Sequence, residues 1–104
     1  MTVELLYFDG CPSYEALLPR LRGLLKDLGV ETAIELRRVE TPEAAEAERF
    51  LGSPTVRIDG RDIEPGVNRR TDFGLKCRIY RGPVSASPLP PEKWIADALG
   101  RLAA

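Results

Sequence analysis

The 104-residue sequence predicts an α/β fold in which helices flank a small mixed sheet of four strands. Three observations lead to this prediction. A short apolar run, an amphipathic segment and a second strand-like run follow one another at the N-terminus, and this βαβ order requires parallel strands. An Asp-Gly pair later separates two alternating runs, which is the strongest short-range signal of an antiparallel hairpin. The length fits one domain, so we expect residues 1–104 to form a single unit.

The first part of the chain alternates between predicted strands and helices. Residues 3–8 are almost continuously apolar, which is typical of a strand buried on both faces. Leucines recur at helical spacing over residues 13–28, with Pro19 inside the stretch and Gly29 directly after it. Residues 32–39 alternate in part and predict a half-exposed strand.

A short second helix is predicted to follow the second strand. Thr41 has the residue type of a helix cap, and Pro42 suits the first helical position. We expect Gly52 to end this helix. Its inner face is expected to consist of Ala44, Ala47, Phe50 and Leu51.

The hairpin and a last helix complete the predicted elements. Residues 55–58 and 61–64 flank Asp59-Gly60, whose types allow the positive φ angles of a tight turn. The last helix is expected to open at residues 90–92. Its apolar face is formed by Trp94, Ile95, Ala98, Leu99 and Leu102.

Residues 65–90 form an atypically long connection, because links between elements usually span about 4–6 residues. The segment contains five basic residues and one acidic residue, a local balance of +4 in a chain of net charge −1. Within it, residues 77–80 are predicted to form a short edge strand.

Composition excludes several classes of function. The net charge of −1 argues against a nucleic-acid-binding protein, which would be clearly basic. No apolar run approaches the ~20 residues that cross a bilayer, so no membrane association is expected. The first residues lack the basic region of a signal peptide, which favours a cytoplasmic location. Without histidine, neither a Cys-His pair nor a His-ligated metal site can form within one chain. The small net charge is compatible with a monomer or a weak homodimer.

Cys11 is the first candidate for chemistry, because it lies between the first predicted strand and the first predicted helix. Pro12 fits the first helical position, which would make Cys11 the cap. Unpaired N–H groups and the helix dipole favour a thiolate there, so the pKa should fall below the free value of ~8.5. A nearby Asp9 carboxylate would act in the opposite direction. The alternative is that Cys11 is a buried, inert cap.

Cys77 is the second candidate and lies among Lys76, Arg78 and Arg81. Neighbouring positive charge stabilises a thiolate, which would help Cys77 attack a mixed disulfide. A disulfide with Cys11 requires Cα atoms within about 7 Å, and sequence spacing leaves that distance open. The alternative is an inward-facing Cys77 on a short strand whose basic neighbours form a solvated face.

These features resemble the thioredoxin-like superfamily, and in length its glutaredoxin-like branch. The Cys11-Pro12 pair matches the start of the glutaredoxin motif, and Pro54 before Thr55 matches the family's cis-proline. Pro19 is similar to the helix-kinking proline of thioredoxins. The residues around Cys11 and the Cys-Arg-x-Tyr stretch also resemble a small bacterial group of thioredoxin-like (seleno)proteins. The resemblance implies a thioredoxin-like order βαβ-α-ββ-α and a reactive group at Cys11.

The chain departs from the family pattern at Tyr14, where the second cysteine of the motif would lie. We therefore expect thiol–disulfide redox chemistry with a single-cysteine motif, possible oxidoreductase activity, and Cys11 as the nucleophile. Cys77 or a low-molecular-weight thiol such as glutathione would resolve the mixed disulfide. The alternatives are a soft-metal or iron–sulfur module and a non-catalytic interaction domain. No resident cofactor or metal site is expected, and the partner would be a thiol or disulfide substrate. The residues predicted to contact that substrate are Pro12, Ser13, Tyr14, Ser53, Pro54 and Thr55.

Overall fold

The computed structural model describes residues 2–103, with side chains described as far as Gly100. It confirms an α/β fold with a mixed four-stranded sheet. The strands are β1 (Val3–Tyr7), β2 (Ile34–Arg38), β3 (Thr55–Ile58) and β4 (Arg61–Asp62), and the helices are α1 (Ser13–Asp27), α2 (Pro42–Ala47) and α3 (Glu92–Ala103). In the order β2-β1-β3-β4, β1 pairs in parallel with β2 and antiparallel with β3, as the βαβ start and the hairpin require.

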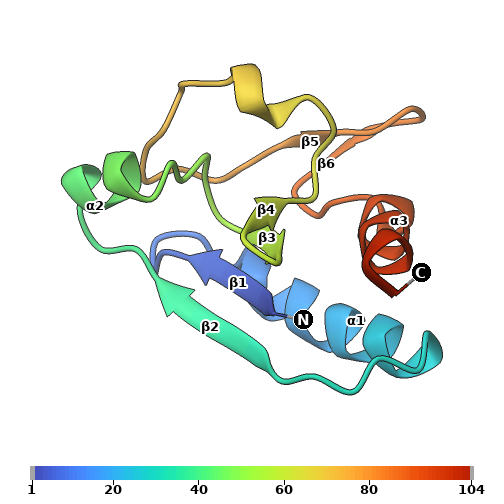
Figure 1. Ribbon diagram of the computed structural model, residues 1–104. Coiled ribbons are helices and arrows are strands. Elements are labelled where there is room, and N and C mark those ends of the chain that lie inside the picture. The colour runs from blue at the N-terminus through green and yellow to red at the C-terminus, as the bar shows by residue number, and fades with distance from the viewer. Residues whose placement is uncertain (1, 104) are drawn as a thin grey trace.

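Helices cover both faces of the sheet (Figure 1). The larger core lies on the face covered by α1 and α3, where Leu5 of β1 packs with Leu21 and Ile95. The smaller core lies on the opposite face, where Leu6 packs with Ala45 of α2 and with Phe50. Adjacent residues of β1 therefore serve two cores, because successive strand side chains point to opposite faces. This confirms the prediction of a central strand.

Local sequence signals account for the turn and the cap that were predicted. Asp59 and Gly60 both adopt positive φ, at 50° and 79°, and join β3 to β4. Thr41 accepts a hydrogen bond from the backbone N–H of Ala44 at 3.0 Å and so caps α2. The paired part of β4 is two residues long, which is shorter than the predicted residues 61–64.

Two predictions about α2 are wrong. The helix ends at Ala47, well before Gly52, because Arg49 takes up a left-handed conformation with φ of 54°. Ala47 is exposed, and Ala45 is the fully buried alanine. The inner face was misjudged because Phe50 lies beyond the helix and enters the core from the loop.

The long connection forms ordered structure above the sheet in Figure 1. It contains a 3-10 turn η1 (Val67–Arg69) and a two-stranded ribbon of β5 (Tyr80–Arg81) and β6 (Ala86–Ser87). The strand predicted over residues 77–80 begins three residues later, at Tyr80. It pairs with β6 and does not extend the edge of the four-stranded sheet. Among the described residues, no helix is long and apolar enough to cross a membrane.

The last helix packs largely as predicted. Ile95, Ala98 and Leu99 are buried, and Trp94 is partly buried beside them. Leu102, which was also placed on this face, lies outside the described side chains.

Candidate functional site

Cys11 lies in the turn between β1 and α1 and is only 1% exposed. Its backbone N–H donates to the carbonyl of Phe8 at 3.3 Å, which closes the turn. The prediction that Cys11 caps α1 is wrong by one residue. Pro12 is the cap, and its carbonyl accepts a hydrogen bond from the N–H of Glu15 at 3.0 Å. Pro12 fits both positions because its fixed φ suits either one.

The fold brings Cys77 directly to Cys11. The two residues are 66 positions apart in the sequence, yet their Cα atoms are 5.6 Å apart and their sulfur atoms form a disulfide. Cys77 is exposed, in contrast to Cys11, so the inward-facing alternative for Cys77 is wrong. The pair therefore combines one enclosed sulfur with one at the surface.

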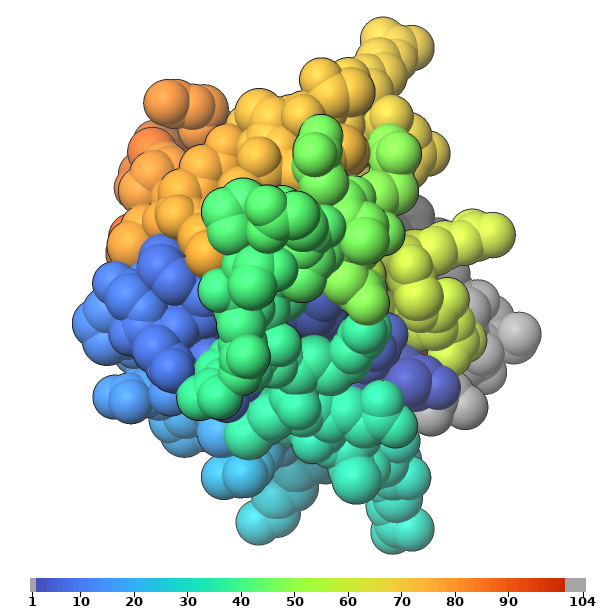
Figure 2. Space-filling model, turned by 90° about the vertical axis from the view of Figure 1, so that its left-hand side faces the viewer, coloured from blue at the N-terminus to red at the C-terminus, as the bar shows by residue number. Residues whose placement is uncertain are grey.

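The backbone of Ser53 holds the segment that carries Cys77. The N–H of Ser53 donates to the carbonyl of Lys76 at 2.8 Å, and its carbonyl accepts from the N–H of Arg78 at 2.9 Å. These two bonds form a parallel bridge between Ser53 and Cys77. In this disulfide form, the backbone groups of Ser53 are already occupied by the protein's own chain. Figure 2 shows the orange segment lying against both the blue turn after β1 and the green α2.

Gly52 allows the bridge to form at close range. Its φ is +124°, and an added Cβ would lie 2.9 Å from the carbonyl oxygen of Lys76 and 3.0 Å from Cβ of Arg78. Any larger residue would therefore have to displace the Cys77 segment as well as adopt an unfavourable backbone conformation.

The Ser53–Pro54 peptide bond is cis, as the resemblance implied for Pro54. The loop lies against Cys11, since the carbonyl oxygen of Ser53 is 3.6 Å from the Cys11 sulfur. The hydroxyl of Ser53 is buried without a hydrogen-bond partner among the described residues. Pro54 and Thr55 are also buried, so the predicted substrate contacts of this loop are covered in this state.

Ser13 contacts the sulfur of Cys11 from the start of α1, with its Oγ at 3.6 Å. A hydroxyl at this position can donate to a thiolate. Tyr14, which occupies the place of the second motif cysteine, stacks on Tyr7 with ring centroids 4.1 Å apart. Of the three predicted substrate-contact residues that follow Cys11 in the sequence, Ser13 is therefore the one whose side chain contacts the Cys11 sulfur.

Arg78 is buried, so the predicted solvated basic face does not extend to it. Its side chain is 0% exposed and donates to Asp62 at 2.7 and 3.0 Å and to Glu64 at 3.3 Å. It also donates to the hydroxyl of Thr55 at 3.0 Å. Strand alternation explains the result, because Cys77 and Ile79 point outward while Arg78 and Tyr80 point inward. Arg78 therefore anchors the segment instead of serving as a free cation beside Cys77.

Tyr80 adds a second anchor. Its hydroxyl donates a hydrogen bond to the carbonyl of Pro54 at 2.5 Å. The guanidinium carbon of Arg78 lies over its ring, 4.4 Å from the centroid, in a cation–π contact. Complete burial raises the pKa of Tyr80 above its usual value, because a charged phenolate would be desolvated. The sequence pattern gives no sign of this hydrogen bond from Tyr80 to the cis-proline loop.

Lys76 is the exposed counterpart of Arg78. It pairs with Asp72 at 2.8 Å, and Asp72 also pairs with Arg70 at 2.8 Å. Hydrogen bonds from Arg70 and Lys76 hold the pKa of Asp72 well below its usual range. One flank of Cys77 is thus fixed at the surface and the other in the interior.

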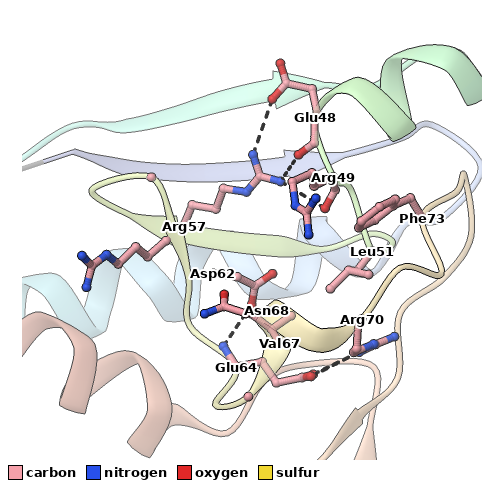
Figure 3. A pocket seen from close by; sticks show the side chains of 13 residues that line it. Glu48, Arg49, Leu51, Arg57, Asp62, Glu64, Val67, Asn68, Arg70 and Phe73 are labelled. Carbon is pink, nitrogen blue, oxygen red and sulfur yellow. Dashed lines mark hydrogen bonds and ion pairs between the residues drawn. The ribbon is translucent and has the colours of Figure 1, made fainter.

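Two hollows of similar size lie on the surface near this segment. The one shown in Figure 3, about 580 Å³, is lined by residues that include Arg57, Arg61 and Phe73 but neither cysteine. The other, about 600 Å³, has Cys77 in its wall together with Ile79. The second hollow is therefore the one that borders the disulfide.

No group of three or more Cys, Asp or Glu side chains arranged to hold a metal ion occurs among the described residues. Comparison with family models, curated proteins and solved structures finds no match.

Proposed function

We propose that this chain is a thiol–disulfide redox protein in which Cys11 and Cys77 form the reactive pair. The observation that carries the proposal is the disulfide between an enclosed cysteine and an exposed cysteine beside a surface hollow. In the exchange reaction, two protein thiols transfer two electrons to a disulfide substrate. The products are the Cys11–Cys77 disulfide and two substrate thiols, and the reverse reaction reduces the protein.

We further propose a thioredoxin-like fold for the chain. Three features support this assignment: the strand order β2-β1-β3-β4, a cysteine directly before α1, and a cis-proline loop against that cysteine. A cytoplasmic location belongs to the same proposal, and in that reducing compartment the pair would act as a catalytic or redox-sensing disulfide. The second thiol comes from the long connection, because Tyr14 replaces the motif cysteine.

A redox titration tests this function. The protein is equilibrated in glutathione buffers of graded ratio, quenched with acid, alkylated, and weighed by intact-mass spectrometry. We expect a reversible change between dithiol and disulfide at a potential of roughly −270 to −120 mV, the range of thiol oxidoreductases. Cys11→Ser and Cys77→Ser must each abolish it. A potential below about −300 mV would indicate a purely structural disulfide and contradict the proposal.

A further inference from the structure

The two sulfur atoms of the pair differ in access. Cys11 is 1% exposed and is enclosed by the turn after β1, by Ser13 and by the loop at Ser53. Cys77 is exposed and forms part of the wall of the hollow of about 600 Å³. Thiol–disulfide exchange requires a thiolate to approach one of the two sulfurs directly, so access decides which one is attacked.

We propose that external thiols react at Cys77, and that Cys11 is the enclosed leaving and resolving thiol. This inference rests on the redox function proposed above and reverses the roles that the sequence predicts for the two cysteines. The roles are reversed because Tyr14 occupies the position of the second motif cysteine. The second sulfur therefore comes from Cys77, whose segment lies over Cys11 on the outside of the molecule.

Reduction of the disulfide takes two exchange steps. A substrate thiolate attacks the Cys77 sulfur, the Cys11–Cys77 bond breaks, and Cys11 leaves as a thiolate. A second substrate thiolate then attacks the substrate sulfur bound to Cys77. This releases the substrate disulfide and the Cys77 thiolate, and both protein thiolates take up protons. Overall, two substrate thiols are oxidised and the protein disulfide is reduced. In the opposite direction, Cys77 attacks the substrate disulfide and Cys11 resolves the adduct.

Cys11 is suited to the role of leaving group. Its sulfur lies 3.6 Å from the hydroxyl of Ser13, which can donate a hydrogen bond to the departing thiolate. The 15-residue helix α1 begins two residues after Cys11, and its N-terminal end favours negative charge. The disulfide bond therefore breaks toward the better-stabilised sulfur.

The charges around Cys77 favour a small anionic thiol. Four basic and two acidic residues line the hollow, and of the four cations Arg78 is buried in ion pairs with Asp62 and Glu64. Asp72 is neutralised by Arg70 and Lys76. Arg81 is exposed and has no acidic partner among the described side chains. Within about one Debye length, roughly 8–10 Å at 0.1–0.15 M salt, such a charge attracts an anionic thiol and repels a cationic one.

A trapping experiment tests the site of attack. The oxidised wild-type protein is mixed briefly with glutathione, quenched with acid, and alkylated with N-ethylmaleimide before peptide mapping. We expect glutathione on Cys77 and the maleimide on Cys11 in the same molecule. Glutathione found on Cys11 would overturn the inference while leaving the redox function intact. A disulfide that glutathione does not reduce would remove both.

Single-cysteine variants give a second measurement that does not depend on a transient adduct. Reduced Cys11→Ser and reduced Cys77→Ser are treated with oxidised glutathione, and adduct formation is followed by mass. We expect Cys11→Ser, which retains Cys77, to react at least tenfold faster. Equal rates, or a faster Cys77→Ser, would contradict the proposal.

A series of size-matched thiols tests the charge preference. The rates of disulfide reduction by 3-mercaptopropionate, 2-mercaptoethanol and cysteamine are compared after correction for thiolate fraction. We expect the order anionic, neutral, cationic, and Arg81→Glu should reduce the anionic advantage severalfold. Arg61→Glu is the matched control, because Arg61 is also exposed but lines the hollow without a cysteine. Equal corrected rates for the three thiols, or equal effects of the two variants, would refute the charge preference.

Discussion

Arg78 and Lys76 flank Cys77, and replacing each with methionine should have very different effects on stability. Arg78 is completely buried, whereas the side chain of Lys76 is 43% exposed. Both replacements remove one positive charge next to Cys77 and keep an unbranched side chain. A difference between the two variants therefore reports on the burial of the ion pair and not on the local charge.

The structure gives the size of the expected difference. Arg78→Met leaves the carboxylate of Asp62, which is only 10% exposed, without its cation, and leaves Glu64, which is 14% exposed, with Arg70 alone at 3.2 Å. Removing one partner of a buried ion pair costs about 3–5 kcal/mol. Lys76→Met breaks a pair with Asp72, whose side chain is 50% exposed, and such pairs contribute about 0.2–1 kcal/mol.

Urea unfolding with the disulfide intact measures both free energies. Trp94 is the only tryptophan and packs edge-on against Tyr80, with ring centroids 6.3 Å apart. Its fluorescence therefore reports on the region where the guanidinium of Arg78 lies over the Tyr80 ring. Arg78→Lys is a further control, because it keeps the charge but loses the paired hydrogen bonds to Asp62.

Equal unfolding free energies for Arg78→Met and Lys76→Met, within about 1 kcal/mol, would refute the buried anchor. Such a result would mean that the carboxylates of Asp62 and Glu64 keep their water in the folded protein and do not need Arg78 as a partner. A large loss for Arg78→Met that Arg78→Lys restores in part is the expected pattern.

Three further perturbations test neighbouring contacts. Tyr80→Phe should cost about 1–3 kcal/mol because a buried carbonyl loses its donor. Burial raises the pKa of Tyr80, so its contribution to the free energy of unfolding is complete below about pH 10 and is lost as the pH rises further. This loss of stability at alkaline pH should be missing in Tyr80→Phe. Because the pKa of Asp72 is lowered, its contribution to the free energy of unfolding is present above about pH 3.9 and is lost at lower pH. Asp72→Asn should therefore reduce the loss of stability in acid, by less than about 1 kcal/mol. Gly52→Ala should destabilise the chain and slow disulfide formation more than Gly60→Ala, since both glycines have positive φ but only Gly52 faces a close contact; equal disulfide formation rates would contradict this.

Local signals were sufficient for most of the fold. The Asp59-Gly60 turn, the Thr41 cap and the central strand follow from neighbouring residues, because turn geometry, capping and strand burial depend on a few adjacent positions. The end of α2 was misplaced because Phe50 contacts a core that the chain assembles from distant elements. Element boundaries are less well determined by sequence because tertiary contacts set them.

The candidate site was predicted only in part, for a related reason. Cys11, Cys77 and Pro54 stand out in the sequence, but their meeting depends on contacts across tens of residues. The burial of Arg78 depends on acids contributed by the hairpin, so a basic cluster in the sequence did not reveal it. A useful signal was available in the alternation of residues 77–80, which places Arg78 and Tyr80 on one side.

The origin of the second sulfur couples redox state to the stability of the long connection. A second motif cysteine would lie in the first turn of α1, three residues after Cys11, and would remain close to it in any state of the long connection. Cys77 instead depends on the bridge to Ser53 and on the buried Arg78. A disulfide that closes a loop of 66 residues stabilises a fold by about 4 kcal/mol through chain entropy, which is comparable to the cost of removing the Arg78 side chain. Linkage between two equilibria is reciprocal. If forming the disulfide stabilises the contacts of Arg78, those contacts favour formation of the disulfide by the same free energy. The contacts that stabilise the Cys77 segment therefore also set how readily a thiol reduces the Cys11–Cys77 disulfide.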